Sequence, residues 1–165
     1  MALPTRPVDD AEIATDWGQA IHDYTFAPSG CRCSGGTITL TTTPATLPID
    51  TAIEDPGGYV STALDRLVVP TGGEGLYAMG VIVQEITGAA TTSTRVYLLV
   101  NGAQVCVATE ENDGGNAVQI PLNTYATLVA GDIVTVQAAK RGTGTSPTAF
   151  ISSLTVVRIG AELGA

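Results

Sequence analysis

The feature that most constrains this fold is a series of short segments in which apolar and polar residues alternate. The alternation begins at Thr37–Thr41, and in Leu76–Ile86 it places every second residue from Tyr77 to Val83 on one face. A period of two residues is typical of β-strands that bury one face. Asn101-Gly102 separates two such segments and predicts a tight hairpin turn, because both positions of that turn favour positive φ.

Turn-forming residues divide the chain into about eight strands, spaced as in sandwiches and barrels rather than in βαβ units. Pro44 and Pro48 limit the segment that contains them to an edge or irregular strand. The predicted loops are residues 54–63, 87–94, 110–116 and 141–147. Besides Thr37–Thr41, eight more regular strands are predicted, and they are Arg66–Val69, Leu76–Ile86, Arg95–Val100, Gln104–Ala108, Ala117–Leu122, Ala126–Val129, Ile133–Ala139 and Ala149–Ile159. The sequence thus predicts an all-β, antiparallel fold with one core.

The first residues have a different pattern. Residues 1–8 contain two prolines and are predicted to form an extended arm, followed by a short helix that Pro28 and Gly30 end. The apolar residues of this helix share one face at helical spacing, and they are Ile13, Trp17, Ile21 and Tyr24. This stripe either packs on its own domain or docks on a partner or on further copies of the chain. We therefore divide the chain into an anchor, residues 1–30, and a β-sandwich domain, residues 31–165.

Composition and charge exclude several classes of partner. The net charge is −9, and no basic patch is present, so we expect binding neither to nucleic acid nor to anionic lipid. No apolar run is long enough to span a bilayer. Met1 to Asp10 lacks a basic region followed by an apolar block, so no signal peptide is expected. Only 14% of residues are charged, which fits a surface that is partly hidden in an assembly.

Residues with catalytic or metal-binding chemistry are few. The one histidine, His22, lies on the predicted helix, and no pocket is expected around the nearby Cys31 and Cys33. These two thiols lack the second Cys or His pair that zinc needs, and with Cys106 they are expected to be free or partly buried. Glu110–Asn116 is rich in possible calcium ligands, but a solvated turn is the simpler interpretation. We expect no catalytic residue, no cofactor and no metal.

Several short motifs follow one another in a familiar order. They are Val69-Pro70 at a strand end, Gly75-Leu76-Tyr77 at a strand start, Asn101-Gly102, Leu128-Val129 with Gly131-Asp132 before Ile133–Val136, and a final strand Phe150–Ile159. In this order, residues 66–159 resemble the C1q/TNF-like jelly roll. The resemblance implies a jelly-roll sandwich for the predicted β domain.

The resemblance also implies an oligomeric state. Proteins of the C1q/TNF-like family are typically compact homotrimers, so a homotrimer is expected here. Aromatic and apolar residues of the inner sheet would then line the threefold axis, with Tyr77 and Phe150 as candidates. For both residues an ordinary core position is the alternative.

The segment Asp10–Asp23, with its Trp-Gly pair, is similar to segments near the start of small virion proteins of tailed bacteriophages. In those proteins an N-terminal anchor precedes a trimeric, β-rich head. The similarity implies a non-enzymatic virion protein, a capsid decoration or short head fibre, which would bind the major capsid protein or a tail component. Such a protein assembles in the host cytoplasm and needs no secretion signal. The alternative is a receptor-binding or adhesion module of a tail tip, which contacts a host glycan or protein through the jelly-roll loops.

Overall fold

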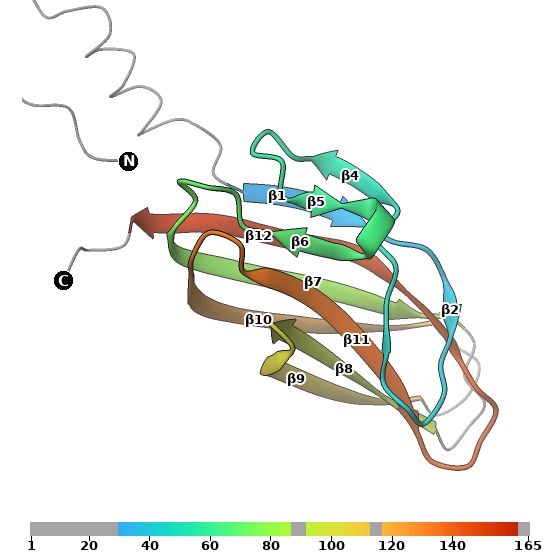
Figure 1. The fold of residues 1–165 in the computed structure, drawn as a ribbon. Helices are drawn as coiled ribbons and strands as arrows, with labels where there is room; N and C mark the ends of the chain where they lie inside the picture. The colour runs from blue at the N-terminus through green and yellow to red at the C-terminus, as the bar shows by residue number, and fades with distance from the viewer. Residues whose placement is uncertain (1–29, 87–91, 113–116, 162–165) are drawn as a thin grey trace, which may run out of the picture.

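Two antiparallel sheets packed face to face form the domain (Figure 1). The computed structural model describes residues 30–86, 92–112 and 117–161. The strands are β1 (Gly30–Ser34), β2 (Ile38–Thr39), β3 (Ala45–Thr46), β4 (Thr51–Glu54), β5 (Val60–Ser61), β6 (Arg66–Val68), β7 (Gly75–Glu85), β8 (Thr92–Val100), β9 (Ala103–Asn112), β10 (Val118–Leu128), β11 (Ile133–Arg141) and β12 (Thr148–Ala161). A short 3-10 helix, Thr62–Leu64, lies between β5 and β6.

The strand order confirms the predicted jelly-roll sandwich. Sheet A has the order β10-β7-β12-β1-β4, and β2 also pairs with β12. Sheet B has the order β5-β6-β11-β8-β9, and β3 also pairs with β11. Strands that follow one another in sequence thus often lie in different sheets, as β7 and β8 do. Within the described ranges, no helix has the length and hydrophobicity that crossing a bilayer requires.

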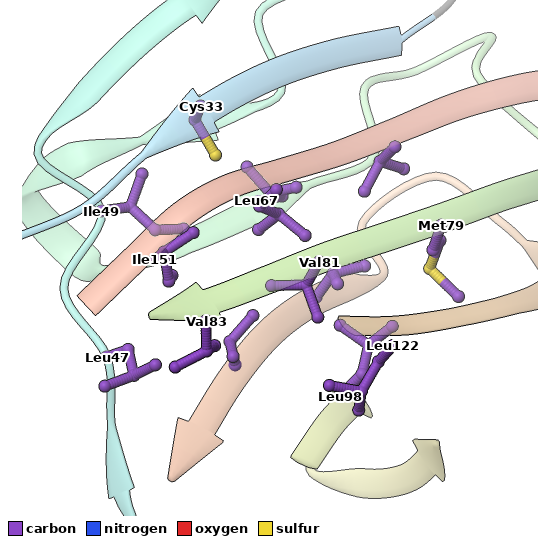
Figure 2. Close-up of a cluster of buried hydrophobic side chains, with 14 of the residues drawn as sticks. Cys33, Leu47, Ile49, Leu67, Met79, Val81, Val83, Leu98, Leu122 and Ile151 are labelled. Atoms are coloured by element: carbon purple, nitrogen blue, oxygen red, sulfur yellow. The ribbon is translucent and has the colours of Figure 1, made fainter. Parts of the chain in front are cut away.

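Alternating apolar residues from both sheets fill the core. In β7, the predicted inward face is confirmed, because Tyr77, Met79, Val81 and Val83 are all buried. Figure 2 shows these β7 valines among side chains from other strands, including Ile151 of β12. Burial of apolar surface at about 25 cal/mol per Å² is the main favourable contribution to folding.

The predicted Asn-Gly turn is confirmed and is tied to a second turn. Asn101 and Gly102 have φ values of 51° and 79°, as the tight hairpin between β8 and β9 requires. The Asn101 amide donates to Asp132 Oδ1 at 2.7 Å and accepts from the Ile133 backbone N–H at 2.9 Å. Asp132 in turn accepts from the Val129 N–H. The Asn101 side chain of the β8–β9 turn therefore holds the turn that leads into β11 in place.

Some predicted boundaries were wrong. The strands expected at Ala117–Leu122 and Ala126–Val129 form one strand, β10, which pairs with β7 without interruption from Val118 to Leu128. The loop expected at residues 54–63 contains β5 and the 3-10 helix. Gly30 begins a strand that the sequence analysis did not predict, β1. The predicted arm and helix, with Ile13, Trp17, Ile21 and Tyr24, lie outside the described residues, as do the predicted anchor contacts.

Candidate functional site

The outer face of sheet A, which points away from sheet B, carries exposed apolar side chains. Tyr125 of β10 and Val157 of β12 lie on either side of Ala78 of β7, by the register of these three strands. Leu76 and Ile82 are further exposed apolar residues on the same face of β7. Tyr125 is the most exposed, at 70% of its surface. A soluble chain seldom leaves such a group of side chains in water unless they contact a partner.

Small residues hollow the centre of this face into a groove of about 390 Å³. Ala78 and Gly80 of β7 form its floor, with Ser153 and Thr155 of β12 at one side. Ile82, Pro121, Tyr125 and Val157 are among the larger residues that line it. A Cβ atom on Gly80 would lie 3.0 Å from Asn123 Oδ1, so glycine keeps the middle of the groove open.

A second groove of about 580 Å³ lies where β1 begins. It shares Thr155 and Val157 with the first groove, so the two adjoin on the same face. Its other lining residues are Gly30, Cys31, Arg32, Glu54, Asp55 and Pro56. The Asp55 carboxylate already accepts two backbone N–H groups, from Tyr59 at 2.7 Å and Val60 at 2.9 Å, which gives it a structural role.

The two residues predicted to line a threefold axis lie in different places. Tyr77 is fully buried between the sheets, where its hydroxyl lies 2.9 Å from that of Tyr59 and donates to the Gly73 carbonyl. A side chain with no exposed surface cannot contact a second chain, so the interface role expected for Tyr77 is corrected to a core role. Phe150 pairs with Gln84 on the outer face of sheet A and is half-buried, and its interface role stays a prediction.

The three cysteines, for which the sequence suggested no clear role, have structural positions in the domain. Cys31 and Cys33 point from β1 into the core, and Cys106 is half-buried on β9. Burial raises the pKa of Cys33 to about 12, with a smaller contribution from the Asp55 carboxylate. Burial likewise raises the pKa of Tyr77, and its hydrogen bond with Tyr59 adds to the effect.

These shifts predict a loss of stability in alkaline solution. Each group is neutral when protonated, and folding raises the Cys33 pKa from 9.0 and the Tyr77 pKa from 10.0. Their contribution is therefore complete below about pH 9 and decreases as the pH rises toward the folded-state values. We expect the free energy of unfolding to fall by about 1.4 kcal/mol per pH unit for each titrating group. Urea unfolding between about pH 8 and pH 10.5 measures this. Cys33→Ala should reduce the slope, and an equal slope would contradict the assignment to Cys33.

The other polar groups singled out from the sequence do not converge on a catalytic site. Glu110 and Glu111, expected in a loop, continue β9 opposite Thr94 and Ser93, so they project from opposite faces. His22 lies outside the described residues. In the parts of the chain that the structure describes, no three His, Cys, Asp or Glu side chains lie close enough together to share a metal ion.

The comparisons with known proteins agree with this arrangement. The globular domain of zebrafish complement 1qA superposes with a TM-score of 0.60 over 82% of this chain and 99% of its own, at 11% identity. The chain has the C1q/TNF-like jelly-roll fold. The Eiger TNF from S. frugiperda matches at a TM-score of 0.51 and 12% identity, with 82% of this chain and 94% of that one covered.

At these identities the C1q/TNF-like likeness establishes the fold alone. No family model matches the sequence, and no curated protein does. The outer face of sheet A was not predicted as a site, although a signal was present. In β7 the residues between the core positions are themselves small or apolar, namely Leu76, Ala78, Gly80 and Ile82. A strand that is apolar on both faces is buried on both faces, within the chain or against another.

Proposed function

We propose that this chain is a non-enzymatic structural module that forms a homotrimer through the outer face of sheet A. The observation that carries the proposal is the grooved apolar face made by Ile82, Tyr125, Val157 and their neighbours. Interfaces between identical subunits are more apolar than other protein surfaces. The threefold symmetry is taken from the C1q/TNF-like fold, whose members are typically trimers, and not from the groove itself.

We further propose that the trimer is a bacteriophage virion protein, a capsid decoration or short head fibre. The similarity of Asp10–Asp23 to the start of such proteins supports this role, together with the low content of charged residues. Residues 1–30 would attach the trimer to a capsid or tail protein through Ile13, Trp17, Ile21 and Tyr24. Three copies of a weak anchor on one trimer bind with a much higher avidity than one.

The oligomeric state is tested first, by light scattering coupled to size exclusion. The expected mass is three times that of the 16.8 kDa chain. A single-chain mass at every concentration would overturn both the trimer and the avidity argument.

The anchor is tested separately with capsids that lack this protein. The full chain should sediment with such capsids, and Trp17→Ala should not, while remaining a trimer. Gln19→Ala, on the opposite face of the predicted helix, is the matched control and should still bind. If the trimer binds host cells and ignores capsids, the receptor-binding alternative is correct instead.

A further inference from the structure

Buried polar side chains gather at one end of the sandwich interior. In the described ranges they are Glu85, Thr92, Thr94 and Asn112, each with at most 2% of its surface exposed. Glu85 is the last residue of β7, Thr92 is the first of β8, and Asn112 is the last of β9. The rest of the core is apolar apart from the Tyr59 and Tyr77 hydroxyls, so this end differs from it in chemistry.

The four residues come from both sheets and face one another. The Asn112 amide of sheet B donates to Glu85 Oε1 of sheet A at 2.9 Å. Thr92 lies directly opposite Asn112 in the β8–β9 register. Thr94 is the next inward position on β8, because burial alternates along that strand from Thr92. Only residues 86–91 join β7 to β8, so Glu85 and the start of β8 lie at the same end of the sandwich.

Two groups in this cluster lack the partners that burial requires. The Thr94 hydroxyl is fully buried and has no hydrogen-bond partner among the residues that the structure describes. The Glu85 carboxylate receives one hydrogen bond among the described residues, from a neutral amide. A buried carboxylate is costly unless a positive charge or several donors compensate it.

The nearest basic side chain along the sheet is engaged elsewhere. Lys140 of β11 pairs in register with Thr94. Its ammonium group, however, donates to the Gly144 carbonyl and to Ser146 Oγ, at 3.4 Å for the latter. Residues 87–91 and 113–116, which follow Glu85 and Asn112 closely in the sequence, contain no lysine or arginine. Neither Lys140 nor these two segments therefore supplies a positive charge that would compensate the Glu85 carboxylate.

We propose that this end of the sandwich binds one cation that prefers oxygen ligands, such as Na⁺, K⁺ or Ca²⁺. Glu85 is its anionic ligand and the Thr94 hydroxyl is a neutral one. Carboxylate, amide and hydroxyl oxygens are the donors that such hard cations take in proteins. The ion would join β7 of sheet A to β8 and β9 of sheet B. It lies inside the sandwich, away from the outer face of sheet A, and does not depend on the trimer.

Thermal unfolding of the full chain in matched salts tests the site. Choline chloride, whose cation is too large for the site, is compared with NaCl, KCl and CaCl₂ at equal ionic strength. The midpoint should rise with one of the three small cations and saturate, by about 4 °C once the ion exceeds its dissociation constant tenfold. The salt that produces the rise identifies the ion.

Two variants assign the effect to the cluster. Glu85→Gln should abolish the rise, whereas Glu111→Gln, on the exposed neighbour of Asn112, should keep it. Thr94→Val removes an unsatisfied hydroxyl at equal volume, so it should raise the midpoint in choline chloride and shrink the cation-dependent rise. Equal midpoints in all four salts would overturn the proposal. A cation-dependent rise of the midpoint that Thr94→Val leaves unchanged would also overturn it. This second outcome can be measured even if Glu85→Gln fails to fold.

Discussion

Ile82→Asp is expected to convert the proposed trimer into single chains, with the mass measured by light scattering falling threefold. Ile82 lines the central groove and is 37% exposed in the isolated chain, so a polar residue there is compatible with folding. In the proposed trimer, each of the three new carboxylates would be buried against apolar surface without a hydrogen-bonding or charged partner. Each such burial costs several kcal/mol and would oppose association.

Val107→Asp is the matched control for this result. Val107 is a branched strand residue of similar exposure, 43%, but it lies on the outer face of sheet B, opposite Tyr97. Its replacement should leave the mass unchanged. If Ile82→Asp keeps the full mass, or if Val107→Asp dissociates the assembly as well, sheet A does not supply the interface.

Gly35→Ala is expected to destabilise the folded chain by about 3–5 kcal/mol, among the largest effects of a single methyl group. A Cβ atom on Gly35 would lie 1.7 Å from the Pro48 carbonyl oxygen, which is backbone and cannot rotate away. The Gly35 N–H also donates to the Ile151 carbonyl at 2.9 Å, so the segment cannot move without losing a bond to β12. The free energy of unfolding in urea measures the loss.

Gly58→Ala separates this clash from the general cost of replacing glycine. Gly58 has a φ of 71° and nothing within 4 Å of an added Cβ, so only the left-handed backbone opposes alanine. We expect a loss of about 1 kcal/mol. Similar losses for the two variants would show that the Gly35 segment adjusts and that the contact with Pro48 is not rigid.

The sequence predicted the strands whose boundaries are marked by turn chemistry. β7 was found because its core residues alternate from Tyr77 to Val83, and the β8–β9 hairpin was found because Asn101-Gly102 adopts positive φ. Both signals are local and lie in adjacent residues. The C1q/TNF-like order of motifs then predicted the jelly-roll class, which no single motif contains.

The strands that were missed depend on contacts far away in the chain. β1 has the sequence Gly-Cys-Arg-Cys-Ser, which has little apolar character, yet it pairs with β12 more than a hundred residues later. The break predicted within β10 fell at residues 123–125, which include the polar Asn123 and Thr124. These residues continue the strand because β7 offers an unbroken row of backbone partners. Tertiary pairing outweighed local propensity in both cases.

The candidate site was predictable only in part. That an apolar face contacts further copies was expected, but Tyr77 was assigned to it because aromatic residues are common in interfaces. The two faces of β7 carry similar apolar residues. The sequence of this strand alone therefore does not say which of the two alternating sets of side chains faces sheet B. The position of Tyr59, whose hydroxyl lies 2.9 Å from that of Tyr77 inside the core, decides which face is buried.

The place of β12 in sheet A has a consequence for synthesis. This strand lies between β7 and β1 and also pairs with β2, yet it comes last in the order of translation. Until residue 161 has left the ribosome, β7 and β1 both present unpaired edges, which can pair with other nascent chains. Domain closure must therefore follow translation of the whole β region. Ribosomes working on the same message would hold several such incomplete sheets close together while these edges are still unpaired.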